Sequence, residues 1–183
     1  MSVRAASLSA VMLLLASTAG ATNLGLSAGV LMPIGDFADQ ADPSPYIGAH
    51  WEIQDINARG QAALLTVIVQ GGFAFLKTDA DLERALDAIG DSGDGSYFDV
   101  GAGVRVHSAA LPIFVTAGAN YVNLNPAGSG GSLHGGGGTI GLGVERSTAQ
   151  IKYGAELRAS FAVLENDVTE QHLLLMGTLG LPF

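Results

Sequence analysis

The sequence contains no cysteine, and positive charge is scarce in it: 8 Lys and Arg residues stand against 17 Asp and Glu residues. The missing thiols exclude a disulfide scaffold, a thiolate metal site, a cysteine nucleophile and a lipid-modified cysteine. The formal net charge of −9 argues against a nucleic-acid partner, which would require a basic surface. Charged residues are only 14% of the chain, against ~25% in an ordinary soluble domain. Glycine (26 residues) and apolar residues (48%) are abundant instead, which excludes a disordered chain.

Residues 1–21 have the three parts of an export signal. One basic residue precedes an apolar stretch from Ala5 to Ala16, and small residues in an A-x-A pattern follow. This pattern predicts cleavage between Ala21 and Thr22, which leaves one domain over residues 22–183. The alternative is an uncleaved membrane helix, but the strongly apolar part is about a dozen residues, against the ~20 that a spanning helix needs.

Beyond the signal, no apolar run is long enough for a spanning helix, and apolar residues alternate with small or polar ones. Eight segments of about ten residues show this period of two, within 23–32, 47–54, 61–77, 97–107, 113–121, 139–145, 150–161 and 173–183. In three of them the polar residues fall on a single parity: His50, Glu52 and Gln54; Asp99, Arg105 and His107; Gln150, Lys152, Glu156 and Arg158. The pattern predicts β-strands with one apolar face.

The composition of the two strand faces indicates which of them is enclosed. The face opposite the apolar one consists mostly of Gly, Ala and Ser with occasional charge, whereas a water-facing sheet would be rich in Lys, Glu and Thr. Apolar residues outside and polar residues inside are typical of transmembrane β-barrels, whose strands need ~9–11 residues to cross a bilayer. We therefore predict an all-β fold, an eight-stranded antiparallel up-and-down transmembrane β-barrel.

The charges on the strands should then line the lumen, because a Lys or Arg facing lipid costs ~2–4 kcal/mol at mid-membrane. Glu52 and Arg105 lie toward the same ends of their strands and are expected to meet. A two-residue turn at 148–149 would place Glu145 directly opposite Lys152. The predicted lumen charge network consists of Glu52, Asp99, Arg105, Glu145, Lys152, Glu156 and Arg158, with His50, His107 and His172 beside it.

An eight-stranded barrel has room only for its own side chains or one small ligand, so we predict a plugged lumen without a continuous water channel. Two alternatives stay open for the charged interior. One is a small gated or leaky pore, and the other is a ligand or proton-linked site built on Asp99, His107 or His172. Because the three histidines lie at different depths, they do not form a ligand cluster, and we predict neither a metal nor a cofactor.

Long and short connections alternate along the chain, as in outer-membrane barrels with long outer loops and short periplasmic turns. An even number of strands places both termini on the periplasmic side. In the second long loop, Thr78 or Asp79 is expected to cap a short helix that runs through Ile89 and covers the rim of the barrel.

The long loops are acidic. Glu165, Asp167 and Glu170 lie in or near the fourth, and the first two carry Asp36, Asp39, Asp42, Asp79, Asp81, Glu83, Asp87, Asp91 and Asp94. We interpret these residues as a solvated, negatively charged surface. The alternative is Ca²⁺ or Mg²⁺ binding at Asp91–Ser96, which has suitable oxygens but lacks the EF-hand spacing.

Ser129, Ser132 and His134 occur in the third long loop, SGGSLHGGGG, and raise the alternative of an outer-membrane lipid-modifying enzyme. That chemistry needs a serine activated by a histidine, which a third group orients. No acidic residue lies nearby in the sequence, and a glycine-rich loop gives a preorganised site poor support. G-x-S-x-G, P-loop, H-E-x-x-H and dinucleotide-binding motifs are all missing. We predict a flexible loop and no enzymatic activity.

The leader, the eight strands over Thr22–Phe183, the final aromatic Phe183 and the segment GVLMPIGDF (Gly29–Phe37) occur together in this chain. In these features it resembles the small eight-stranded outer-membrane barrels of Gram-negative bacteria, the OmpA/OmpX-type porin-family superfamily. The resemblance implies an integral outer-membrane monomer in contact with lipid and lipopolysaccharide, with both termini periplasmic. It also implies a C-terminal signal for the barrel-assembly machinery in Leu179, Leu181 and Phe183. Leu181 stands where an aromatic residue is usual, and Pro182 lacks an N–H for strand pairing.

The sequence thus predicts a structural or surface-interaction protein that contacts its ligands through its loops.

Overall fold

The computed structural model describes residues 23–39, 41–56, 63–78, 84, 86, 95–108, 110–127, 131–148 and 150–182. These residues lie mostly in strands: β1 (Asn23–Pro33), β2 (Ala41–Asp42), β3 (Ser44–Ile56), β4 (Ala63–Thr78), β5 (Gly95–Ser108), β6 (Ile113–Asn125), β7 (Leu133–Ser147), β8 (Lys152–Leu164) and β9 (Thr169–Pro182). Two single-turn 3₁₀ helices, η1 (Gly35–Phe37) and η2 (Glu165–Asp167), lie between strands. No helix within these ranges has the length and apolar composition needed to cross a membrane.

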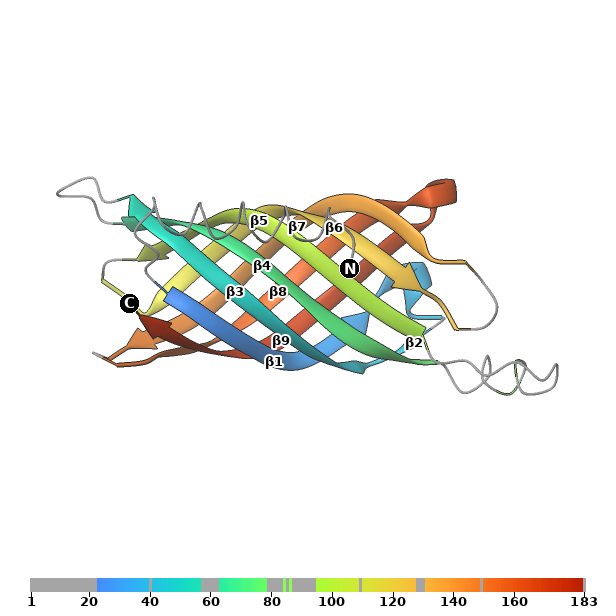
Figure 1. The fold of residues 1–183 in the computed structure, drawn as a ribbon, viewed down its shortest axis with the longest axis horizontal. Helices are drawn as coiled ribbons and strands as arrows, with labels where there is room; N and C mark the ends of the chain where they lie inside the picture. The colour runs from blue at the N-terminus through green and yellow to red at the C-terminus, as the bar shows by residue number, and fades with distance from the viewer. Residues whose placement is uncertain are drawn as a thin grey trace, which may run out of the picture.

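All the strands except β2 form one closed antiparallel barrel (Figure 1). Each of these strands pairs with the next along the chain, and β9 pairs back onto β1 from Asn23↔Pro182 to Pro33↔His172. The closure confirms the predicted eight-stranded up-and-down barrel and leaves its long strands without an open edge. The two-residue β2 was not expected; it pairs with Thr78 and Lys77 at the end of β4, outside the ring of eight.

The strands are tilted because the register closes with a stagger. If the residue paired with Tyr46 is traced from strand to strand through β4, β5 and β6, the path reaches Leu133 in β7. If it is traced the other way through β1, β9 and β8, it reaches Gly143 of the same strand. An offset of ten positions in eight strands corresponds to a tilt of roughly 40°. A barrel of this size is narrow, so inward side chains from opposite walls can touch.

Large apolar side chains cover the outer wall, and charged side chains lie inside. Val104 and Leu157 are 40% and 47% exposed, whereas Glu52 and Arg158 are 2% and 5% exposed. Successive residues of a strand point to opposite faces, so each strand contributes one residue set to the wall and one to the lumen. The face assignment predicted from the sequence is confirmed for the described strands.

The two ends of the barrel differ in their connections. β1 begins and β9 ends at the same end (Figure 1), where residues 148–151 join β7 to β8. In that turn the Thr148 N–H donates to the Ile151 carbonyl at 2.8 Å. η1, β2 and η2 lie at the opposite end. We call these the turn end and the loop end.

Two predicted loop segments are in fact strand. His134 and Gly135–Gly138 lie in β7, where the glycines pair with β8 from Leu164 to Phe161, so the flexible-loop prediction for this segment is wrong. Glu170, which the sequence placed in or near the fourth loop, is the second residue of β9. Strand pairing outweighs the weak strand preference of glycine when both neighbouring strands are in place.

Several sequence predictions fall outside the described residues. They are the cleavage site at Ala21 and Thr22, the terminal Phe183 and the acidic positions Asp79, Asp81, Glu83, Asp87, Asp91 and Asp94. Of the helix predicted to run through Ile89, only residues 84 and 86 are described, and both have helical backbone.

Candidate functional site

The turn-end half of the lumen holds ion pairs centred on Arg105. Its Nη1 donates to Glu52 Oε1 at 2.8 Å, and its Nη2 donates to Glu156 Oε2 at 2.9 Å. A third carboxylate oxygen, Glu145 Oε2, lies 3.5 Å from Nη1. Arg105 is on β5 and the three acids are on β3, β8 and β7, so one guanidinium connects opposite walls. Its side chain is 1% exposed, and a charge buried to this degree depends on its partners because water no longer solvates it.

Lys152 and Arg158 complete this group, which we call the turn-end ion cluster: Glu52, Arg105, Glu145, Lys152, Glu156 and Arg158. Lys152 Nζ lies 2.7 Å from Glu52 Oε2 and 2.9 Å from Glu145 Oε1. Arg158 Nε donates to Glu156 Oε1 at 3.0 Å. The expected contact between Glu52 and Arg105 is thus present, and Lys152 bridges it to Glu145.

The register expected for Glu145 and Lys152 is wrong, although the two side chains meet. The turn spans 148–151 rather than two residues, so Ser147 lies opposite Lys152 and Glu145 lies opposite Gly154. The long lysine side chain reaches diagonally along the strand pair, a direction in which extended side chains still make contact.

Neutral side chains that the sequence analysis did not single out complete the cluster. Asn23 Nδ2 donates to Glu52 Oε2 at 3.2 Å, and Arg105 Nε donates to Thr116 Oγ1 at 3.4 Å. The Arg105 guanidinium carbon lies 4.1 Å from the centroid of the Phe114 ring, a cation–π contact. The alternation within residues 113–121 places Phe114 on the inner face, but it does not indicate which inward residues lie at the same level along the barrel axis.

Asp99 belongs to a second group, nearer the loop end. The Tyr46 hydroxyl donates to Asp99 Oδ1 at 3.0 Å. The Tyr97 ring meets the His172 ring edge-on, with centroids 5.0 Å apart, and His172 Nδ1 contacts Glu170 Oε1. The seven-member network predicted from the sequence therefore divides into the six-member cluster and a separate Asp99–tyrosine pair.

Glu170 is a lumen residue that the sequence analysis misplaced. It is 1% exposed, on the inner face of β9. Glu170 has the same parity as His172, which faces the lumen. It lies close to the loop, however, and the alternation predicted for this strand began only at Leu173. Carrying the alternation of β9 back by two positions would have found it.

A cluster of apolar side chains lies in the loop-end half of the lumen. Its buried members include Leu31, Phe37, Tyr46, Leu76, Tyr97, Val122, Leu124, Leu164, Leu174 and Met176. Apolar side chains therefore dominate this half of the lumen, where Asp99, Glu170 and His172 are buried polar residues. On the turn-end side of the apolar cluster, a void of about 10 Å³ is lined by residues that include His50, Gln70 and Arg158. A space of ~10–15 Å³ holds about one water molecule.

His134 forms a pair with an acidic residue at the loop end. His134 Nε2 lies 3.1 Å from Glu165 Oε1, with both side chains about half exposed. Glu165 comes from η2, which follows β8, the neighbour of β7; sequence proximity could not reveal this contact. Ser132 Oγ donates to Asn123 Oδ1 at 3.1 Å, and Ser129 lies outside the described residues. The described hydroxyl is therefore bonded to an amide rather than to the histidine.

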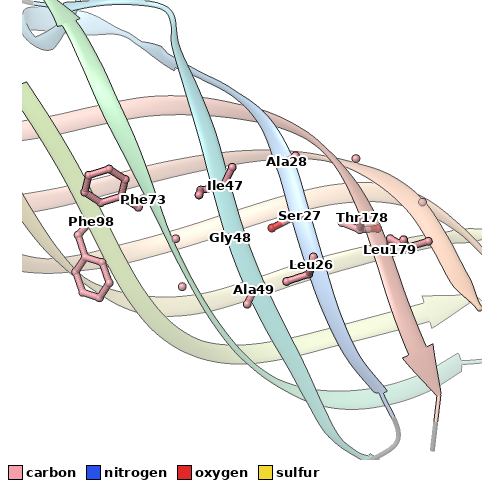
Figure 2. A pocket seen from close by; sticks show the side chains of 14 residues that line it. Leu26, Ser27, Ala28, Ile47, Gly48, Ala49, Phe73, Phe98, Thr178 and Leu179 are labelled. Atoms are coloured by element: carbon pink, nitrogen blue, oxygen red, sulfur yellow. The ribbon is translucent and has the colours of Figure 1, made fainter. Parts of the chain in front are cut away.

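The outer wall has an apolar hollow of about 820 Å³, lined mainly by β1, β3, β4 and β9 and also by Phe98 of β5 and Gly154 of β8 (Figure 2). Its lining includes the large apolar side chains of Leu26, Ile47 and Phe73 and the small ones of Ala28 and Ala49. Its lining contains no titratable side chain, so it offers no acid–base or metal chemistry. Across the described ranges, no three His, Asp or Glu side chains are placed to hold a metal ion.

A closed ring of eight tilted antiparallel strands, apolar outside and charged inside, is the fold of the small outer-membrane β-barrels. The structure is similar to that of Neisserial surface protein A, with a TM-score of 0.57 and 16% identity over 88% of this chain and 96% of that one. It is also similar to Ail, the attachment invasion locus protein of Yersinia pestis (TM-score 0.52, 14% identity, 89% and 99% covered). A major outer membrane protein from Thermus thermophilus is a further match (TM-score 0.50, 15% identity, 88% and 99% covered). Identities this low show a shared fold alone.

No family model and no curated protein sequence matches the chain.

Proposed function

We propose that the chain is an integral outer-membrane protein with a structural or surface-interaction role, held in the membrane by its barrel and active through its loop end. Residues 1–21 would direct export and be removed between Ala21 and Thr22. The turn end, with both termini, would face the periplasm. Leu179, Leu181 and Phe183 would provide the assembly signal.

The observation that carries this proposal is the inverted polarity of the strands. Leu26 and Ile47 on the outer wall are 67% and 64% exposed, while Arg105 is 1% exposed. In water such a wall would be a large unprotected apolar surface, far beyond what a soluble monomer presents. In a bilayer the same wall is in its preferred solvent, and the buried charges satisfy one another.

The lumen is proposed to be closed to bulk water. The apolar cluster fills one half, and the turn-end ion cluster crosses the other with contacts of 2.7–3.5 Å. A plugged interior leaves the loop end as the surface for contacts with lipopolysaccharide or a surface ligand. The described acidic residues there, Asp39, Asp42, Glu165 and Asp167, are exposed and give it negative charge.

Membrane fractionation combined with a gel-shift assay tests the proposal directly. The chain should partition with outer membranes, and the unboiled protein should migrate differently from the boiled protein because a folded barrel resists detergent denaturation. Recovery in the soluble fraction, with one mobility under both conditions, would contradict the proposal.

A small gated pore is the competing interpretation of the charged interior. Planar-bilayer recordings of the folded chain should show no steady conductance if the lumen is closed. Long-lived openings of uniform size would favour the pore instead, and they should then change in the Arg105→Gln variant.

A lipid-modifying activity is a second candidate, because Glu165 supplies the acid that an activated histidine needs. Expression of the chain should leave the mass of lipid A unchanged if our proposal holds. A mass shift that disappears with His134→Ala would establish the enzyme.

A further inference from the structure

Arg146 is an outward-facing cation near the turn end of the barrel. It lies in β7, one residue before the strand ends at Ser147, and its side chain is exposed. Its cross-strand partner is Tyr153, which is 44% exposed on the same outer face. Within the part of the chain that the structure describes, the side chain of Arg146 makes no hydrogen bond or ion pair. The other basic side chains nearby, Arg105 and Lys152, point into the lumen.

A mostly apolar hollow of about 470 Å³ lies directly beside this arginine. Pro112, Val144, Tyr153, Gly154 and Ala155 line it, with Arg146 among the lining residues. Glu145 also contributes to the lining, but its carboxylate lies in the lumen, 2.9 Å from Lys152 Nζ. The charge presented at the hollow is therefore positive. Its volume falls within the ~300–1,000 Å³ typical of ligand sites.

These features match the two halves of a phospholipid. A guanidinium binds a phosphate through charge-assisted, often bidentate hydrogen bonds. Tyrosine is enriched where headgroups meet the acyl region, because its ring is apolar and its hydroxyl is polar. A cation on the lipid face costs little near the interface, in contrast to the bilayer midplane. Position, charge and apolar lining thus agree on one kind of occupant.

We propose that Arg146, Tyr153 and the adjoining hollow bind one phospholipid, with its phosphate on the Arg146 guanidinium and an acyl chain against Val144 and Ala155. The proposal rests on the membrane insertion proposed above. It commits to phospholipid rather than lipopolysaccharide because the turn end would face the periplasmic leaflet, whose lipids are phospholipids.

Native mass spectrometry of the folded full chain, titrated with phosphatidylglycerol in detergent, tests this site. Arg146→Gln should reduce the affinity for the first retained lipid about fivefold, the effect of removing one basic residue near a membrane surface. Ala155→Leu, which narrows the hollow without changing charge, should reduce it as well. Lys77→Gln is the matched control, because it removes an exposed cation at the loop end and should leave retention unchanged.

Equal retention by wild type and Arg146→Gln would overturn the proposal, as would an equal loss in Lys77→Gln. A parallel titration with lipid A distinguishes the two phosphate-bearing lipids, and an Arg146-dependent preference for lipid A would overturn the assignment to phospholipid. Retention is measured only on protein that shows the gel shift. A chain that never gives the shift would contradict the proposed function itself, whereas a folded chain without Arg146-dependent retention would contradict this inference alone.

Discussion

Arg105 is the residue on which the largest number of buried charges depends. It contacts Glu52, Glu145 and Glu156, and it packs on Phe114. Replacing two charged partners with apolar groups can be neutral, but removing one partner leaves buried charge unbalanced. Without Arg105, two cations, Lys152 and Arg158, would remain in contact with the three carboxylates. The contribution of Arg105 to stability therefore comes from balancing the buried negative charge of these carboxylates.

Arg105→Met should lower the free energy of unfolding by about 3–5 kcal/mol, the usual cost of breaking a buried ion network from one side. Guanidinium titration in lipid vesicles, followed by gel shift, measures this change. Lys77→Gln, at an exposed position, should stay within about 0.5 kcal/mol of the wild type.

The double variant Glu52→Gln/Arg105→Met gives a second check on the same contact. The two residues are in direct contact, so the double variant should be more stable than the sum of the two single losses implies, by about 0.5–3 kcal/mol. Strict additivity would mean that the 2.8 Å contact contributes nothing.

At the scale of single elements, β7 shows how a run of glycines becomes a strand. A Cβ placed on Gly137 would overlap the Phe161 carbonyl oxygen, whereas a Cβ on Gly136 would lie 3.7 Å from its nearest neighbour, the Asn120 carbonyl oxygen. The inward position thus requires glycine because the β8 backbone approaches closely. The outward position does not.

Gly137→Ala should destabilise the barrel by about 1–3 kcal/mol, the range for overpacking a closely packed interior. Gly136→Ala, one residue away in the same strand, should be neutral or stabilising by about 0.4–1 kcal/mol, because alanine restricts the unfolded chain. Unfolding midpoints of the two variants measured side by side test this contrast, and equal effects would argue against the register of β7 on β8.

The predictions that the structure contradicts also concern single strands and turns. Turn length sets register, and the turn 148–151 carries no residue pattern that distinguishes four residues from two. The apolar half of the lumen was missed because inward residues such as Leu31, Leu124 and Leu164 are as apolar as their outward neighbours. Alternation is informative only where the two faces differ.

For the whole molecule, the sequence predicted the strand number, the closure and the orientation of each face. Charged residues on one parity, such as Asp99 and Arg105, made this assignment strong because they are tolerated on only one side of the wall. The grouping of charges into clusters could not be predicted, since it depends on the stagger of the closed barrel rather than on any one strand.

The single tryptophan of the chain tests the orientation of the wall in solution. Trp51 shares the outer face of β3 with Ile47. Vesicles with brominated acyl chains should quench its fluorescence strongly once the barrel has folded. In a Trp51→Phe background, tryptophan introduced by Phe114→Trp should escape quenching because position 114 faces the lumen. Equal quenching of both would contradict the assigned faces.

The pairing of β9 with β1 has a consequence for how the protein is made. The first strand to leave the ribosome cannot complete its backbone hydrogen bonds until the last strand arrives. In a chain truncated before Thr169, β1 and β8 would be edge strands with unpaired backbone N–H and C=O groups. Each edge could then pair with a strand of another chain. We therefore expect the barrel to close only after β9 is available to pair with β1.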